Sequence, residues 1–222
     1  TVSPLIDLWG FGRHRQEGVI PSDADIARAR ALVDYRQLEV DPVQARAKKH
    51  IALTIDVNGI AQGYSVDQVA DVLTAAGCSD YLVELGGELR LAGHNPQQKL
   101  WRIGIEKPVD GFGGAQQALR ATGIGVTTAG DYHDYFEKDG VRYSHTIDPR
   151  TGRPIAHKLA SVTVVADNAT LADGWDTALE VMGPEAGFDF AEKHKIAAFF
   201  IVREGDQFVT RYSSPMKGFL SE

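Results

Sequence analysis

Three acidic side chains and one hydroxyl share a face of a predicted helix. The segment 171–182 has an apolar stripe at helical spacing, formed by Leu171, Trp175, Ala178, Leu179 and Met182. On a wheel of about 100° per residue, the opposite stripe contains Asp173, Asp176, Thr177 and Glu180. Hard cations such as Mg²⁺ take oxygen ligands, and Asp173 and Thr177, four residues apart, could supply two of them. A solvated face of an ordinary amphipathic helix has the same pattern, so both interpretations stay open.

His145 lies where a strand-like run meets a turn. The run 143–148 leads into a change of chain direction that Pro149 and Gly152 indicate. A histidine in this position could act as a general base near neutral pH. It could equally be a hydrogen-bonded strand residue, with Asp148 as an ordinary opener of the turn.

Glycines mark two further places where a ligand could approach the backbone. We expect 57–63 to be a strand-to-helix loop whose amides could hold a phosphate, although it matches neither common phosphate-binding pattern. The sequence 84–88 has two glycines after a strand, which fits either a ligand contact or a tight turn.

Composition limits the possible functions. The 222 residues are 43% hydrophobic and 24% charged, which is typical of a folded globular chain. Thirty acidic residues against 23 basic ones give a net charge of −7, which argues against a nucleic-acid partner. Cys78 is the only cysteine, so an internal disulfide and a cysteine metal cluster are excluded. No apolar run approaches the ~20 residues of a membrane-spanning helix, so we expect no transmembrane segment.

The elements that must position these residues are mostly strands. We expect helices over 22–33, 64–76, 169–182 and 184–193. Strands are expected over 1–8, 38–40, 50–55, 81–85, 88–92, 100–105, 123–129, 135–137, 141–143, 160–165, 197–202 and 207–212. Because most strands follow one another without helices between them, the sequence predicts an α+β fold with mainly antiparallel sheets and a few packed helices. We expect one domain over 1–222.

The order of the motifs along the chain resembles that of the ApbE family of FAD:protein FMN transferases. The resemblance covers essentially the whole chain and is carried by 56–67, Leu85-Gly86-Gly87, 101–103, Thr128-Ala129-Gly130, 144–152 and 172–179. It implies a T-fold-related flavin transferase fold. Family members usually start with a secretion signal or lipoprotein anchor and further strands. We therefore expect this chain to lack the leading part of that fold, and its parent to be a periplasmic protein lipid-anchored to the inner membrane.

The resemblance also implies a reaction and its partners. A threonine or serine hydroxyl of an acceptor protein attacks the FMN-side phosphorus of FAD, AMP leaves, and FMN stays attached to the acceptor. The implied acceptors are electron-transfer proteins of the Rnf or sodium-translocating NADH:quinone oxidoreductase type, with a D-G-x-[S/T/A]-T segment. Two alternatives are a magnesium-dependent FAD pyrophosphatase, which passes FMN to water, and a non-catalytic flavin-binding module.

The residues that the resemblance assigns to this reaction fall into three groups. Mg²⁺ is expected on Asp173, Thr177 and the Gly59 carbonyl, with Asp176 assisting. The base that deprotonates the acceptor hydroxyl is expected to be His145. Two positions are expected to contact the flavin nucleotide, namely Gln62 and Ile147.

Overall fold

The computed structural model describes residues 1–12, 15–16, 18–109, 114–130 and 134–221. The chain divides into two compact units. Unit 1 consists of Thr1–Val57 and Asp134–Ala156, and unit 2 of Asn58–His133 and His157–Glu222. Each unit is described by itself below, and the single domain over 1–222 stays a prediction.

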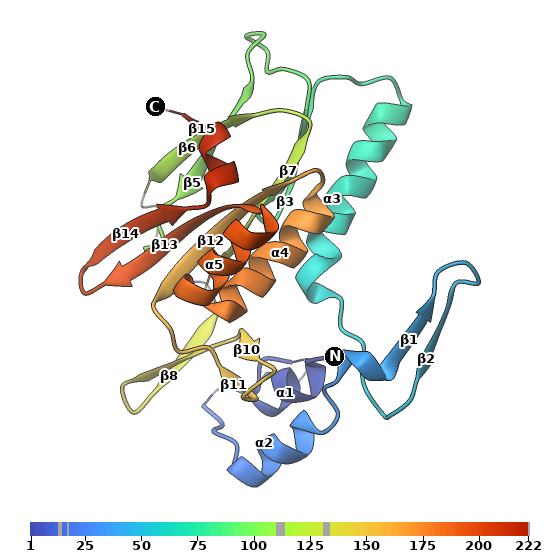
Figure 1. Cartoon of the computed structure of the whole chain (residues 1–222), viewed down its shortest axis with the longest axis vertical. Helices are drawn as coiled ribbons and strands as arrows, with labels where there is room; N and C mark the ends of the chain where they lie inside the picture. The colour runs from blue at the N-terminus through green and yellow to red at the C-terminus, as the bar shows by residue number, and fades with distance from the viewer. Residues whose placement is uncertain (13–14, 17, 110–113, 131–133, 222) are drawn as a thin grey trace. The chain divides into compact units, whose positions relative to one another are not determined.

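Unit 2 is built on a six-stranded antiparallel sheet with the order β14-β13-β12-β7-β4-β3 (Figure 1). Its strands are β3 (Tyr81–Leu85), β4 (Glu88–Ala92), β7 (Ile124–Gly130), β12 (Leu159–Ala166), β13 (Ala197–Glu204) and β14 (Gln207–Tyr212). A three-stranded antiparallel sheet with the order β15-β6-β5 is formed by β5 (Trp101–Glu106), β6 (Ala115–Ala121) and β15 (Leu220–Ser221). The expected α+β class with antiparallel sheets is confirmed.

Both faces of the central strands are covered, because alternate residues of a strand point to opposite sides. On β13, Phe199 and Ile201 join a core with Ile103 and Leu119 of the three-stranded sheet. The alternate residue Phe200 packs in a second core that includes side chains of α4 (Ala169–Met182) and α5 (Pro184–His194). The central sheet of unit 2 therefore lies between a layer of helices and a smaller sheet.

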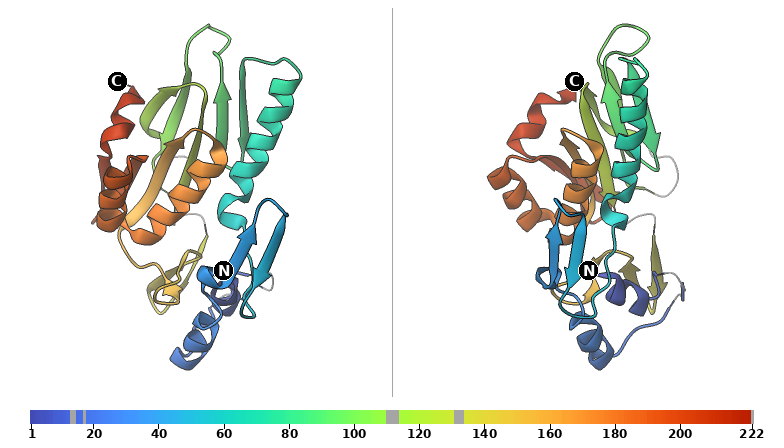
Figure 2. Two further views of the ribbon diagram at one scale, coloured as in Figure 1. Left: turned by 45° about the vertical axis from the view of Figure 1, so that its right-hand side comes forward. Right: turned by 90° about the vertical axis from the view of Figure 1, so that its right-hand side faces the viewer.

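Helix α4 is the centre of the helical layer. It packs on β7 and β12 and contacts both α5 and α3 (Asn58–Ala75) (Figures 1 and 2). The helix begins after Asn168, whose Oδ1 accepts the Leu171 amide at 2.8 Å, and it ends at Gly183, which has a φ of 83°. An asparagine cap and a glycine in the left-handed region are typical helix boundaries, and the expected range 169–182 is confirmed.

The described residues of unit 1 form two short α-helices, one 3₁₀-helix and three strand pairs. These elements are α1 (Ser3–Leu8), α2 (Asp23–Arg30), η1 (Tyr35–Gln37), β1 (Leu38–Asp41), β2 (Arg46–Lys49), β8 (Tyr135–Lys138), β9 (Val141–Ser144), β10 (Ile147–Asp148) and β11 (Arg153–Pro154). Leu5, Trp9, Ile26, Phe136 and Ile147 form its core. The indole N–H of Trp9 donates to the Gly152 carbonyl at 2.9 Å, which ties the first helix to the turn that follows His145.

Several predicted elements are wrong. The segment 1–8 is not a strand but contains α1, because a helix brings Leu5 and Trp9, four residues apart, to the same buried side. The second strand of the first hairpin is β2, not 50–55, and all four of its residues are exposed, so no burial pattern marks it. The segment 58–63 is the start of α3, not a loop. Strand β6 was not predicted, since pairing with β5 and β15 overrides its weak strand propensity.

Among the helices of the described ranges, none combines the length and the apolar character needed to cross a lipid bilayer.

Candidate functional site

Two glycines of α3 let it approach α4 closely. A Cβ atom added to Gly59 would lie 3.3 Å from Cγ2 and 3.5 Å from Oγ1 of Thr177. A Cβ atom added to Gly63 would lie 2.9 Å from Cβ of Asp173 and closer still to the Ala169 carbonyl. The two helices meet at distances that only glycine permits at position 63. The structure thereby brings Gly59, Thr177 and Asp173 together.

The acidic face of α4 is buried. Asp173, Asp176 and Glu180 are only 5%, 2% and 3% exposed, whereas Leu171 and Trp175 from the apolar stripe are 48% and 36% exposed. The interpretation of an ordinary solvated polar face is therefore wrong. Ala172 and Leu179 of the same helix are also buried, in a core shared with the sheet.

Asp173 accepts a main-chain hydrogen bond from the neighbouring helix. The Gly63 amide donates to Asp173 Oδ2 at 2.9 Å. A regular helix would direct this amide to the carbonyl of Gly59, four residues earlier. Its donation to Asp173 competes with that bond and favours a lone pair on the Gly59 oxygen for another partner. The second oxygen of Asp173 and the Gly59 carbonyl are thus both suited to bind a cation.

Burial sets the ionisation of this acidic group. It raises the pKa of Asp173, and it raises the pKa of Asp176 well above its usual range, with the charges of Asp173 and Glu180 acting in the same direction. Within the described part of the chain, neither aspartate has a lysine or arginine as an ion-pair partner. A buried carboxylate without a positive partner is costly. The group would therefore bind a cation favourably.

The donor set fits a hard cation such as Mg²⁺. The described residues contain no group of three or more His, Cys, Asp or Glu side chains arranged to hold a metal ion. The predicted set is of another kind, since it combines one or two carboxylates, a hydroxyl and a carbonyl, all of them oxygen ligands. Thr177 Oγ1 donates to Asp176 Oδ1 at 3.3 Å, which leaves the lone pairs of the hydroxyl for a cation.

A buried glutamate lies next to the Gly86–Gly87 turn. Glu88 is 8% exposed, and its Oε2 is buried and makes no hydrogen bond among the described residues. Burial raises its pKa to about 7, and the charges of Asp173 and Glu84 add to this increase. A Cβ atom on Gly86 would collide with the side-chain amide of Gln62 and lie 3.4 Å from Glu88 Oε2. Gln62 thus lies beside this turn, where its exposed side chain could contact a ligand.

His145 lies in unit 1, in the segment between β9 and β10. Its Nδ1 is 2.9 Å from the carbonyl oxygen of Asp134, and its main-chain amide donates to the same oxygen at 3.1 Å. Since a carbonyl only accepts, Nδ1 carries the hydrogen in the neutral ring and Nε2 carries the lone pair. Nε2 is 3.5 Å from Thr146 Oγ1. The ring is therefore held in the tautomer that a general base requires.

Ile147 contributes its side chain to the core of unit 1, where it is 5% exposed. It faces Pro154 across the β10–β11 pair, and the hydrogen bond from the Ile155 amide to the Thr146 carbonyl marks the adjacent pair as the hydrogen-bonded one. The main-chain groups of Ile147 therefore point away from β11. Any contact of Ile147 with a ligand would use these main-chain groups.

Comparisons with known proteins show the family of this chain. The model of the ApbE family matches residues 1–200. The chain belongs to the ApbE family. An FAD:protein FMN transferase of Vibrio cholerae is 43% identical over 222 residues, which cover 100% of this chain and 66% of that protein. The FAD:protein FMN transferase of Escherichia coli strain K12 is 41% identical over 223 residues, which cover 99% and 64%. The chain thus spans between 64% and 66% of the length of these curated relatives.

Solved structures of ApbE proteins have the same fold. The apo form of Pseudomonas stutzeri flavinyl transferase ApbE aligns with a TM-score of 0.88 and 48% identity, covering 98% of this chain and 67% of that one. Flavin transferase ApbE from Vibrio cholerae aligns with a TM-score of 0.88 and 42% identity, covering 99% and 70%. The expected ApbE-like flavin transferase fold is confirmed.

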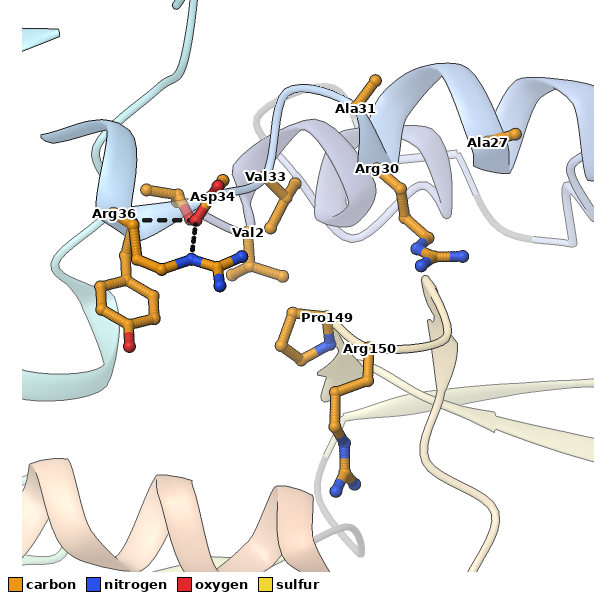
Figure 3. Close-up of a pocket in the computed structure, with 11 residues that line it drawn as sticks. Val2, Ala27, Arg30, Ala31, Val33, Asp34, Arg36, Pro149 and Arg150 are labelled. Atoms are coloured by element: carbon orange, nitrogen blue, oxygen red, sulfur yellow. Dashed lines mark hydrogen bonds and ion pairs between the residues drawn. The ribbon is translucent and has the colours of Figure 1, made fainter. Parts of the chain in front are cut away.

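A cavity of about 790 Å³ in unit 1 of this ApbE chain has a different composition from the predicted site (Figure 3). Val2, Val33 and Pro149 contribute apolar lining, and Arg30, Arg36 and Arg150 are the basic residues. Asp34 accepts hydrogen bonds from the amide and Nε of Arg36 at 3.1 and 2.8 Å. Its described lining includes none of the seven predicted site residues, so this cavity is not part of the predicted site.

Two residues near the predicted site, Glu88 of β4 and Asp67 of α3, were missed in the sequence. The sequence contains no signal that Glu88 is buried, because buried and less buried positions do not alternate regularly along its strand, β4. Asp67 accepts three hydrogen bonds from the start of α4. Its spacing of four residues from Gly63 and eight from Gly59 could have placed it on the same face of α3.

Proposed function

We propose that the protein transfers FMN from FAD to a threonine or serine hydroxyl of an acceptor protein and releases AMP, with Mg²⁺ bound by Gly59, Asp173 and Thr177. The observation that carries the proposal is Asp173, a buried carboxylate of raised pKa that contacts the helix bearing Gly59. Membership of the ApbE family and the names of its relatives support the choice of FAD as substrate.

The reaction replaces a phosphoanhydride bond of FAD with a phosphoester bond to the acceptor. The acceptor oxygen forms a bond to the FMN phosphorus, the bond from this phosphorus to the bridging oxygen breaks, and AMP leaves with that oxygen. Bound Mg²⁺ supplies positive charge that offsets the negative charge of the pyrophosphate and of the departing AMP. Positioning and charge neutralisation are the main contributions of a protein to phosphoryl transfer.

In our proposal, each residue of the site has a separate role in the reaction. Asp173, Thr177 and the Gly59 carbonyl hold the cation, and Asp176 orients the Thr177 hydroxyl. His145 accepts the acceptor proton at Nε2, because Nδ1 is already held by the Asp134 carbonyl. Gln62 contacts the nucleotide through its side chain, and Ile147 contacts the flavin through its main chain.

The biological setting in this proposal follows from the family. The acceptor is an electron-transfer protein of the Rnf or sodium-translocating NADH:quinone oxidoreductase type with a D-G-x-[S/T/A]-T segment. The parent protein acts in the periplasm, lipid-anchored to the inner membrane. Both points can be tested separately from the chemistry.

The test uses the protein as encoded by its full gene. It is incubated with FAD, Mg²⁺ and an acceptor that contains the D-G-x-[S/T/A]-T segment, and covalent flavin is read as fluorescence of the acceptor band in a denaturing gel. We expect a fluorescent band and one AMP per flavin, both abolished by EDTA. His145→Ala should keep FAD binding and lower transfer by about 10²-fold or more, the usual contribution of a general base.

The same experiment separates the alternatives. Free FMN and AMP with no fluorescent acceptor would support the FAD pyrophosphatase instead. FAD binding without AMP release, in the wild type as in Asp173→Ala and His145→Ala, would support a non-catalytic flavin-binding module. AMP release that EDTA leaves unchanged would contradict the metal assignment.

A further inference from the structure

Asp67 of α3 holds the start of α4. Its Oδ1 accepts the Ala169 amide at 2.9 Å, and its Oδ2 accepts the amide and the hydroxyl of Thr170 at 2.8 and 2.6 Å. The first amides of a helix have no partner within the helix. Asn168 satisfies the third amide, that of Leu171. Two of the first three amides of α4 are therefore satisfied by a neighbouring helix and not by its own cap.

A basic side chain fixes Asp67 in turn. Arg90 of β4 lies with its Nε 3.7 Å from Asp67 Oδ1, and its guanidinium also donates to the carbonyl of Asp167, just before α4. Both side chains are largely buried, with 23% of Arg90 and 14% of Asp67 exposed. Strand β4, helix α3 and the start of α4 are thereby joined through one carboxylate.

The contacts between α3 and α4 repeat every four residues. Asp67 contacts Ala169, Gly63 contacts Asp173, and Gly59 lies against Thr177. From one contact to the next, the residue number decreases by four in α3 and increases by four in α4. The two helices therefore pack antiparallel along matching ridges. The first contact involves no proposed cation ligand, and the other two contain all three proposed main ligands.

We infer that Asp67 is a positioning residue for the cation site. By holding the first turn of α4 against α3, it sets the register in which Asp173 and Thr177 face the Gly59 carbonyl. The inference rests on the proposed function, because it concerns the cation that this function requires. Residues that orient metal ligands commonly change metal affinity by about 10- to 100-fold when they are replaced.

The test measures Mg²⁺-dependent FAD binding to the full-length protein, followed by quenching of flavin fluorescence during a Mg²⁺ titration. We expect Asp67→Asn to raise the Mg²⁺ concentration for half-maximal binding by about tenfold or more. Thr170→Val removes only one of the three hydrogen bonds and should raise it by a smaller factor. Urea unfolding of each variant shows that it is folded.

The matched control is Asn168→Ala. It removes a cap from the same helix end without touching α3, so it should lower the midpoint of urea unfolding and leave the Mg²⁺ requirement unchanged. If Asp67 only stabilised the fold, the Mg²⁺ requirement of both Asp67→Asn and Asn168→Ala would rise as their stability falls. Thr170→Ser keeps the hydroxyl and should behave as wild type.

The possible outcomes distinguish the proposed function from the proposed role of Asp67. If the wild type binds FAD without any effect of Mg²⁺, both the proposed function and this inference fail. If the wild type depends on Mg²⁺ and folded Asp67→Asn has the same requirement, only the inference fails. Should Asp67→Asn not fold, an unchanged requirement in Thr170→Val overturns the inference. An equal increase in Asn168→Ala also overturns it.

Discussion

Two regions of the molecule bury aspartates to a similar extent with opposite consequences. Asp148 in the turn of unit 1 is 9% exposed, and Asp173 and Asp176 on α4 of unit 2 are 5% and 2% exposed. Burial opposes ionisation at Asp148, yet the hydrogen bonds and charge of Arg150 hold the pKa of that carboxyl below its usual range. Burial raises the pKa of both α4 aspartates.

The difference lies in where the positive charge comes from. Arg150 reaches both oxygens of Asp148, with Nε 2.9 Å from Oδ1 and Nη2 2.9 Å from Oδ2. The negative charge of Asp148 in this turn is therefore neutralised by Arg150. The α4 aspartates receive a main-chain amide and a hydroxyl instead of a cation. Such a site is stabilised when a proton or a cation from outside neutralises it, which is the property expected of a binding site and not of a structural ion pair.

The largest expected effect comes from Asp173→Asn, which keeps the shape of the side chain and removes its charge. AMP release from FAD should fall by about 10³-fold, as several kcal/mol of transition-state stabilisation are lost with the cation. The free energy of unfolding without Mg²⁺ should not fall, because a buried charge is removed. Asp189→Asn on the exposed side of α5 is the control and should change neither. If Asp173→Asn releases AMP at the wild-type rate, the assignment of Asp173 to a functional cation site is wrong.

Glu88→Gln tests whether the acidic group destabilises the cation-free protein. Folding raises the Glu88 pKa from 4.5 to about 7, so the folded state holds a proton that the unfolded state has released. The contribution of Glu88 to stability should therefore be highest below about pH 4.5 and should fall by about 3 kcal/mol as the pH rises to about 7. In Glu88→Gln this fall should disappear. Urea unfolding in EDTA from pH 4 to 8 measures it, and parallel profiles for both proteins would contradict the assignment.

A smaller effect of opposite sign should distinguish Asp148→Asn from Asp176→Asn. At pH 7 the first loses a charged hydrogen-bond pair and should destabilise the protein by about 1–2 kcal/mol. The second removes a costly buried carboxyl and should stabilise the protein in EDTA. The Asp176 difference should vanish below about pH 4, where the unfolded aspartate is itself protonated. The Asp148 difference should disappear only at lower pH, as the pH falls through the lowered pKa of the folded carboxyl. Thermal and urea unfolding at pH 7 and pH 3.5 give the signs. If the stabilities of Asp148→Asn and Asp176→Asn change in the same direction at pH 7, Arg150 does not account for the difference between the two regions.

The limits of α4 and the β8–β9 hairpin could be predicted because local signals are strong there. Asn168 and Gly183 mark the two ends of α4, and Asp139-Gly140 marks the β8–β9 turn. The segment 1–8 could not be assigned, because a short apolar run is ambiguous between strand and helix until its partners are known. The helical start of α3 was hidden by its glycines, which serve the contact with α4.

The structure brings three of the predicted site residues together, while their roles stay a prediction. Gly59, Asp173 and Thr177 meet as the motif resemblance implied. A helical wheel cannot tell which face is buried, and here the acids of the polar face are buried while Leu171 and Trp175 are 48% and 36% exposed. The contributions of Glu88 and Asp67 depend on contacts between distant segments, so a sequence read one helix at a time does not contain them.

The four-residue repeat between α3 and α4 has an evolutionary consequence. Each residue of a helix advances the side chain by about 100°. One residue inserted between Gly59 and Asp67 would leave Asp67 bound to Ala169 and rotate Gly59 by that angle away from Thr177. Descendants of this sequence can therefore change many surface residues of these helices, but they cannot gain or lose single residues between 59 and 67 or between 169 and 177 and keep the site.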